Sequence, residues 1–314
     1  MWLDVLNITA PLFMLIGLGY FSVRINLFQQ AELQGTAKFV MRIGLPALIF
    51  NSIAGQPLNQ VFNPAYVAGY GSASLAVFAI GYLVSRHIRK ETGSATAVNA
   101  LGVSLSNTGF IGYPLLAMTL GSSEAGQYLV MNILIENVMI LPLFFIIADA
   151  AQQSGKNWRE NLLGIIKNLA KNPIILAISI SILIALLQLP IPTAIAKTAN
   201  LLSTAAAPVA LFVIGGGLAG LKLQGKLPDL IGIALGKTVL FPALVSLGLW
   251  LAEASAQTIF AGALLSCVPM ASMYPLLAMQ YGHQQRGSAA MLVTTCFSFF
   301  SISLVLLIGK ANGF

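Results

Sequence analysis

Two ionisable side chains lie in the interior of long apolar stretches. Glu136 stands in the run from Asn132 to Asn137, and Lys237 stands in the stretch 229–251. If these stretches cross a bilayer, each charge costs about 2.5–3.5 kcal/mol and marks a functional site by default. Glu136 could carry a proton, since burial favours the neutral form of a carboxyl group. Lys237 could neutralise an anionic substrate or pair with an acid.

Both groups also have structural interpretations. Glu136 can be a structural acid whose hydrogen bonds are satisfied, and Lys237 can extend its long side chain to the membrane surface. Asn132 and Asn137 flank Glu136 and are candidates for the same coupling site. The sequence alone leaves these interpretations open.

The apolar stretch 95–120 is expected to break as a helix. Pro114 lacks a backbone donor and clashes with the preceding turn, and Gly109 weakens the helix further. The polar residues 106–108 can cap a helix that restarts after the break.

The stretch 257–280 is expected to break as well, because Pro269 and Pro275 lie six residues apart. Unwound backbone at membrane depth is tolerated where protein buries it or where it lines a watery cavity. Matched breaks point to a transport site, and the N-terminus of a half-helix suits an anion such as a carboxylate. The alternative is that the prolines kink helices for packing. The candidate substrate-binding residues are Asn107, Thr108, Gly109, Tyr113, Pro114, Cys267, Val268, Pro269, Met270, Ser272, Tyr274 and Pro275.

The elements that position these residues belong to a chain suited to lipid. It has 314 residues, of which 57% are hydrophobic and 8% charged, whereas a soluble domain carries about 25% charged residues. A span needs about 20 mostly apolar residues, and such stretches use nearly the whole chain as a single membrane domain. We predict spans at 5–23, 36–54, 64–85, 95–120, 126–148, 172–189, 200–221, 229–251, 257–280 and 288–309.

Basic residues are distributed unequally between the loops. With ten spans, nearly all of the 16 lysines and arginines fall on one side, and the other side holds Lys197 and Lys310. This distribution predicts that the basic loops are cytoplasmic and that both termini face away from the cytoplasm. It also argues against nucleic-acid binding, because the net charge of +7 is spread over short loops between spans.

The two halves of the chain repeat one pattern. The hexapeptide 113–118 recurs unchanged as 274–279, which is 161 residues later. Pro46 and Pro208 are 162 residues apart in similar surroundings. A common offset across several features indicates an internal repeat.

Each half therefore holds five spans, in repeat 1 at about 5–150 and repeat 2 at about 172–311. Because five is odd, the second half enters the membrane in the opposite orientation, as in many secondary transporters. The tract 154–171 has hydrophobic residues at helical spacing, which predicts an amphipathic cytoplasmic helix that tethers the halves or has a regulatory role. The glycines of 215–220 are expected to permit close helix packing.

The chain lacks the usual groups for catalysis at membrane depth. His87 and His283 lie in predicted cytoplasmic loops, and paired acids and metal-binding motifs are absent from the sequence. Cys267 and Cys296 predict neither a disulfide framework nor a metal site, and Cys296 is expected to be a small buried hydrophobe. We expect no enzymatic activity, cofactor or metal. A channel or sensor built on a transporter fold is the alternative to a carrier.

The chain resembles the auxin efflux carrier family, which includes bacterial malonate-permease-like proteins. The resemblance covers essentially the whole chain and is most specific at residues 106–116 and at Val268-Pro269. It implies an all-α integral membrane fold of ten transmembrane helices in two inverted five-helix repeats. The broken helices 4 and 9 would cross, as in bile acid–sodium symporters. A transport domain would move as an elevator against a scaffold. Asn107 would contact the substrate carboxylate, and Pro114 and Pro269 would shape the crossing.

Two departures from related proteins bear on coupling. Bile acid–sodium symporters hold sodium with an acid in the helix 9 break, and the segment from Cys267 to Tyr274 contains no acid. Plant auxin exporters carry an acid in span 3, which is uncharged from Pro64 to Ser85. Proton coupling or uniport is therefore favoured over sodium coupling, and auxin is not expected as the substrate.

The expected function is secondary transport, by efflux or exchange, of a small organic anion such as a carboxylate. The anion would cross the cytoplasmic membrane by alternating access, with its site at the helix 4 and helix 9 crossing. The alternative is sodium-coupled symport of a bile-acid-like or other amphipathic anion. The expected partners are the anion, the lipid bilayer and protons, without nucleic acid, and a homodimer is left open.

Overall fold

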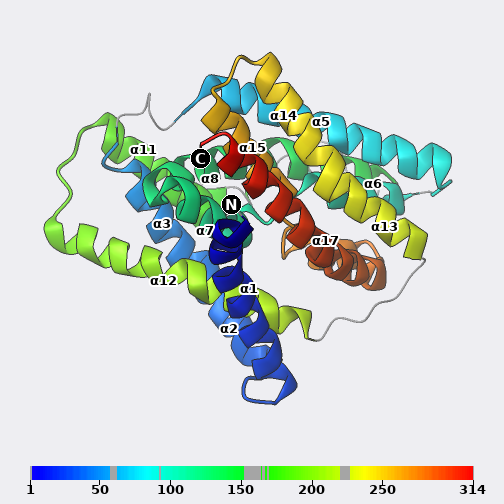
Figure 1. The fold of residues 1–314 in the computed structure, drawn as a ribbon, viewed down its shortest axis with the longest axis horizontal. Coiled ribbons are helices and arrows are strands. Elements are labelled where there is room, and N and C mark those ends of the chain that lie inside the picture. Colours follow the sequence, from blue (N-terminus) through cyan, green and yellow to red (C-terminus); the bar gives the residue numbers. More distant parts are fainter. Residues whose placement is uncertain are drawn as a thin grey trace.

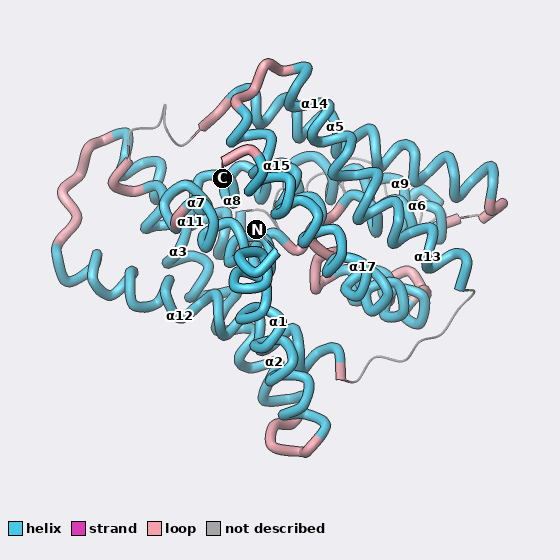
Figure 2. The backbone as a smooth tube through the Cα atoms, in the orientation of Figure 1, coloured by secondary structure: helices cyan, strands magenta, loops and turns pink. Residues whose placement is uncertain are grey.

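The computed structural model describes residues 2–56, 62–91, 93–151, 164, 167, 170–219 and 227–313, with the backbone alone for residues 2–8. This part of the chain is helical almost throughout, and its one β-type feature is an isolated bridge (Figures 1 and 2). In the following order, η denotes a π-helical segment. The elements are α1 (Trp2–Arg24), α2 (Gln30–Phe39), η1 (Val40–Gly44), α3 (Leu45–Ile53), α5 (Pro64–Leu83), η2 (Val84–Ile88), α6 (Ser94–Ser104), η3 (Thr108–Gly112), α7 (Tyr113–Leu120), α8 (Ser122–Ile135), η4 (Glu136–Ile140), α9 (Leu141–Ala151), α11 (Pro173–Leu186), α12 (Thr193–Leu218), α13 (Leu227–Leu235), η5 (Gly236–Leu240), α14 (Phe241–Leu251), α15 (Ala256–Cys267), α16 (Tyr274–Gln280) and α17 (Gln284–Ala311).

The helices coincide with the apolar stretches of the sequence. Differences at the ends are small. The largest are at the seventh stretch, where the helix begins at Thr193 instead of the predicted 200, and at the second, where it begins at Gln30 instead of 36. Five helices in the described residues are long and apolar enough to cross a membrane: Pro64–Ile88, Ser122–Ala151, Thr193–Leu218, Leu227–Leu251 and Gln284–Ala311. The architecture is therefore that of a helical membrane protein. The amphipathic helix predicted at 154–171 lies mostly outside the described residues.

Proline fixes where these helices widen into π turns. A proline has no N–H, and its ring clashes with the carbonyl group four residues earlier. The turn before it can avoid the clash by widening to the i→i+5 pattern, which is common at functional sites. Four π segments, η1, η3, η4 and η5, are followed directly by Leu45-Pro46, Tyr113-Pro114, Leu141-Pro142 and Phe241-Pro242.

The helices pack in two groups around a shared centre (Figure 1). In the first group, α1 packs along α12, and α3 packs against α11 and α12. In the second group, α14 packs against α5 and α15, while α17 packs against α13, α15 and α16. The helices α7 and α8 contact both groups, since α7 contacts α1 and α15 and α8 contacts α3 and α5.

Glycines set the close approach of α1 and α12. A Cβ atom at Gly19 would overlap the carbonyl oxygen of Phe212, and one at Gly215 would overlap that of Ile16. The prediction of close packing is thus confirmed for Gly215, and also for Gly216. It is wrong for Gly217, which has no described atom near the position of a Cβ, and Gly220 lies outside the described residues.

Large apolar side chains cover the outside of the molecule. Leu201 is 73% exposed and Phe300 is 72% exposed, which lipid tolerates and water would penalise. Cys267 is buried, but Cys296 on α17 is exposed, so the prediction that Cys296 is buried is wrong. In a bilayer an apolar side chain can face outward without cost, and hydrophobicity therefore does not predict burial.

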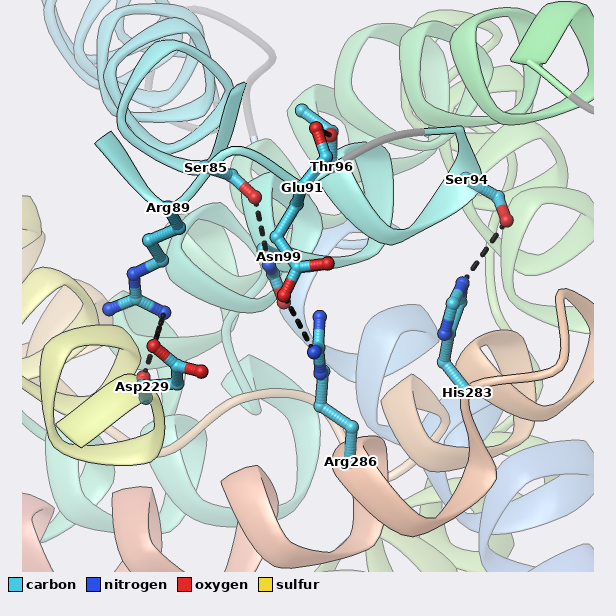
Figure 3. Close-up of polar contacts among 9 residues, drawn as sticks. All are labelled: Ser85, Arg89, Glu91, Ser94, Thr96, Asn99, Asp229, His283 and Arg286. Atoms are coloured by element: carbon cyan, nitrogen blue, oxygen red, sulfur yellow. Dashed lines mark hydrogen bonds and ion pairs between the residues drawn. The ribbon is translucent and has the colours of Figure 1, made fainter. Parts of the chain in front are cut away.

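Polar contacts join the helix ends at one end of the second group (Figure 3). Arg286 at the start of α17 forms an ion pair with Glu91, at 2.7 Å between Nη2 and Oε1. Arg89 after η2 lies 3.7 Å from Asp229 on α13 and donates a 3.0 Å hydrogen bond to the Asp229 carbonyl oxygen. These contacts attach the α5–α6 connection to α13 and α17.

Candidate functional site

The two helix breaks meet in the interior of the molecule. Helix α6 ends at Ser104 and α15 ends at Cys267, and the chain then becomes extended in both places. Ser106 and Met270 form an antiparallel bridge, and the Asn107 N–H donates a 2.8 Å hydrogen bond to the Pro269 carbonyl oxygen. Each break therefore supplies backbone partners that the other needs, as buried polar groups require.

Asn107 also joins the breaks through its side chain. Its Nδ2 donates a 2.8 Å hydrogen bond to Ser272 Oγ, and the residue is 3% exposed. Asn107 occupies the N-cap position of η3, but its side chain does not cap that helix. The prediction of a capping role for the polar residues of this break is thus not met at Asn107, because the amide is engaged across the crossing.

Lys237 is completely buried beside the same crossing. Its Nζ donates 2.6 Å hydrogen bonds to Ser106 Oγ and to the Ser266 carbonyl oxygen, and it lies 4.6 Å from the centre of the Phe241 ring. The alternative that Lys237 extends to the membrane surface is wrong. The side chain instead places an ammonium group between the ends of α6 and α15.

Glu136 approaches the crossing from η4. Its Oε1 accepts a 3.2 Å hydrogen bond from the Ser106 N–H, and its Oε2 accepts a 3.4 Å hydrogen bond from Thr108 Oγ1. The residue is 7% exposed. Ser106 therefore contacts both ionisable groups, through its N–H to Glu136 and through its hydroxyl group to Lys237.

Aromatic rings from α5 line the site next to these groups. Tyr66 stacks on Tyr70 with ring centres 5.4 Å apart, and Tyr70 meets Phe241 edge-on at 5.6 Å. Tyr66 donates a 2.7 Å hydrogen bond to Asn132 Oδ1, one turn before Glu136. The hydroxyl group of Tyr70 and Nδ2 of Asn132 are buried, and neither forms a hydrogen bond with the residues that the structure describes. This wall thus adds two buried polar atoms near the charged groups.

Comparison with known proteins identifies the kind of protein that carries this site. Residues 4–306 match the family model described as "Membrane transport protein". The chain belongs to the membrane transport protein family. It is 27% identical over 306 residues to a Rhizobium meliloti (strain 1021) protein named "Putative malonate transporter", covering 96% of this chain and 95% of the relative. It is also 27% identical over 219 residues to "Uncharacterized transporter YfdV" of Escherichia coli (strain K12), covering 68% of each. The resemblance to auxin efflux carriers is thereby confirmed.

In this membrane transport protein, most of the predicted site residues lie at the crossing. Those from the breaks are largely buried, and Gly109, Ser272 and Pro275 are partly exposed. Asn137 differs from the others, because its Nδ2 donates to the Ile133 carbonyl oxygen of its own helix at 2.9 Å. The buried residues from the breaks are Asn107, Thr108, Tyr113, Pro114, Cys267, Val268, Pro269, Met270 and Tyr274.

Four contributors were not among the sequence candidates. Ser106 and Ser266 bind Lys237, while Tyr66 and Tyr70 form the aromatic wall. Ser106 directly precedes Asn107, and Ser266 precedes Cys267, so both adjoin predicted positions. The tyrosines are spaced by four residues in span 3, which places them on one helix face. A search for charges in that span could not find them.

Proposed function

We propose that this protein is a secondary carrier for a small organic anion, with a carboxylate as its ligand at the crossing of the two breaks. The observation that carries the proposal is the buried junction of Asn107, Ser106 and Lys237, where a cation and polar donors meet unwound backbone. Such junctions at membrane depth are the usual transport sites of repeat-based carriers. The name of the Rhizobium meliloti relative makes malonate the first ligand to test.

The proposed architecture is ten transmembrane helices in two inverted five-helix repeats, at about 5–150 and 172–311. The breaks are equivalent in the sequence repeat, and they pair antiparallel, as an inverted repeat requires. The repeated Tyr-Pro pairs also begin α7 and α16, with proline in the first turn of each. One difference is that the first half-helix starts earlier, at Thr108, through η3.

The two packed groups correspond to a scaffold and a transport domain in this proposal. The group that contains α1 and α12 would be the scaffold, and the group that contains α5, α14 and α17 would move as an elevator. The side chains at the crossing are buried, with Asn107 at 3% and Lys237 at 0% exposure. The substrate therefore reaches them after a conformational change, as alternating access requires.

The carboxylate would bind at the start of η3. The first N–H groups of a helix lack partners within the helix, and the Asn107 side chain does not cap this one. The helix dipole favours an anion at the same place. Lys237 adds a positive charge nearby, because its ammonium group binds the hydroxyl group of Ser106, the residue before Asn107. The Asn107 amide can donate a second hydrogen bond besides the one to Ser272.

The carrier would be coupled to protons or would work as a uniporter, and it would not be coupled to sodium. Sodium is held by oxygen atoms, in the manner of other hard cations, and two oxygen atoms at this junction already bind the Lys237 ammonium group. Glu136 lies on the other side of Ser106 and supplies a group that can exchange a proton. The distribution of basic residues over the loops supports a location in the cytoplasmic membrane with both termini on the non-cytoplasmic side.

Counterflow in proteoliposomes tests this function. Vesicles that contain the purified protein are loaded with unlabelled malonate, and uptake of labelled malonate is compared with uptake into unloaded vesicles. We expect internal malonate to accelerate uptake several-fold, because a carrier returns faster when loaded. Equal uptake in both vesicles would indicate a channel. Absence of uptake across a panel of mono- and dicarboxylates and aromatic acids would overturn the proposal.

A further inference from the structure

A small cavity lies between α5, α6 and α13, extending along η2 and η5. Its volume is about 100 Å³, and its polar lining consists of Ser85, Arg89 and Asn99 (Figure 3). The remaining lining is aliphatic or glycine. On helix 227–251 the lining runs from Gly232 to Leu240, which is about 12 Å along a helix axis. The cavity therefore reaches from the helix ends toward the middle of the molecule.

The polar atoms of the cavity require a ligand. Asn99 Nδ2 donates a 2.8 Å hydrogen bond to Ser85 Oγ, but Asn99 Oδ1 is buried and has no partner in the described part of the chain. Asn99 is 3% exposed and Ser85 is 1% exposed. The Ser85 hydroxyl group accepts from Asn99 and keeps its own proton to donate. An ordered water molecule needs space and polar partners. This cavity has room for water and offers one free acceptor and one free donor.

The inner end of the cavity adjoins the Lys237 site. Gly236 lines the cavity and directly precedes Lys237, while Val103 lines the facing wall three residues before Ser106. Val103 packs tightly here, because a Cβ atom at Gly236 would lie 2.9 Å from its Cγ1. Val103 therefore packs against the residue that directly precedes Lys237.

The outer end of the cavity reaches the ion pair of Arg89 and Asp229. These side chains are 18% and 26% exposed, so this end is accessible to solvent. In the proposed orientation it faces the cytoplasm, because it lies among the basic loops. The cavity thus connects a wet surface with the neighbourhood of Lys237.

We propose that this cavity is a water-binding site that connects the Lys237 amine to the cytoplasm for proton exchange. The proposal rests on the proposed carrier function and names its cytoplasmic proton path. In the exchange step the ammonium group gives one proton to a cavity water, which leaves a neutral amine and a hydronium ion. The reverse step restores the ammonium group and the water. Movement of Val103 would open the contact between water and amine.

Several other titratable groups surround this path. Glu136 from η4 and Cys267 from α15 interact with Lys237, and Tyr70 from α5 lies across the Phe241 ring. Arg89 and Asp229 stand at the outer end of the cavity, and α6 contributes no titratable side chain. Asn99 and Ser85 do not titrate. Their replacement therefore tests the water path without changing any charge.

Hydroxyl-radical labelling with mass spectrometry tests for the bound water in the unmodified protein. Radicals formed from a bound water oxidise its neighbours even when these are buried. Ile233 lines the cavity and Leu230 does not, although both lie on α13 and are 3% and 1% exposed. We expect several-fold more oxidation of Ile233, and we expect Asn99→Leu to abolish the difference. Equal labelling in the unmodified protein would overturn the water site.

Transport at varied internal pH tests the path. In proteoliposomes of defined orientation, Asn99→Leu should lose its response to pH on the cytoplasmic side and keep its response on the opposite side. Asn51→Leu is the matched control, because Asn51 makes the same type of bond, 3.1 Å from Nδ2 to Ser203 Oγ, in the other helix group. If Asn99→Leu unfolds, Ser85→Ala provides the same test. A wild-type response to cytoplasmic pH in these variants overturns the path. Labelled Ile233 in a protein that transports no carboxylate would instead refute the carrier function alone.

Discussion

Lys237 Nζ lies 2.6 Å from Ser106 Oγ, so a side chain from η5 holds the break between α6 and η3 directly. The same nitrogen donates to the Ser266 carbonyl oxygen at the end of α15, which is the broken helix 9 of the proposed architecture. One buried cation therefore binds both broken helices. Because Ser106 also donates to Glu136, a proton or substrate that alters either charge acts on the crossing itself.

Replacement of Lys237 by methionine should abolish most transport. A hydrogen bond to a charged group contributes about 1.5–3 kcal/mol, so we expect a loss of roughly ten- to a hundredfold in the rate of malonate counterflow. Sodium should not restore it, and a sodium gradient should not stimulate the unmodified protein. Lys197→Met, at an exposed site on α12, is the control. Full activity of Lys237→Met would refute a role for this cation.

Glu136→Gln should weaken the pH dependence of transport and leave the part that Lys237 contributes. Glutamine keeps an oxygen atom that can accept from the Ser106 N–H or Thr108 but cannot exchange a proton. Initial rates are measured from pH 5.5 to 8.5 for this variant, for the unmodified protein and for Glu253→Gln, which changes an exposed acid outside the site. The control should follow the unmodified profile. Identical profiles for all three proteins would leave Glu136 as a structural acid.

Asn107→Ala should abolish stabilisation by the substrate. A ligand that binds the folded protein raises its melting temperature in proportion to the logarithm of its concentration over its dissociation constant. A thermal-shift screen of dicarboxylates, amino acids and aromatic acids should find stabilising ligands for the unmodified protein. Asn312→Ala, which changes an exposed asparagine near the C-terminus, should retain the shift. If Asn107→Ala retains it too, the proposed site is misplaced.

The helices and the positions of both breaks were predictable from this sequence. Apolar length and proline spacing are local properties, and they placed the breaks near Asn107 and Pro269, where the chain is unwound. The fold also brings Glu136 and Lys237 to one serine, although 101 positions separate them in the numbering. The sequence marked each charge as costly in lipid, which explains why both were found as candidates.

Contacts across the crossing were not predictable in the same way. The side chain of Asn107 was expected to be available as a cap, but Ser272 binds it, because the two breaks lie side by side in space. Likewise Tyr66 and Tyr70 are uncharged and occur in a uniformly apolar span, so composition gave no reason to select them. The outward position of Cys296 escaped prediction for a different reason, since lipid removes the rule that apolar groups lie inside.

His283 should make the polar contacts at the end of the bundle sensitive to acid. Burial, together with the charge of Arg286, lowers the pKa of His283 from its ordinary value, and Glu91 opposes this effect. The unfolded chain, with a histidine pKa of about 6.5, then binds a proton more readily than the folded chain. Stability from the neutral ring is therefore present above about pH 6.5 and is lost as the pH falls through the lower folded pKa.

Thermal unfolding in detergent between pH 7.5 and 5 measures this effect. The ring of His283 shares a 3.1 Å hydrogen bond with Ser94 Oγ, which glutamine can replace without titrating. We expect acid to lower the melting temperature of the unmodified protein by a few degrees more than that of His283→Gln. His87→Gln, at an exposed position on η2, should behave like the unmodified protein. Parallel melting curves for all three proteins would show that His283 does not couple protonation to the packing of α6 against α17.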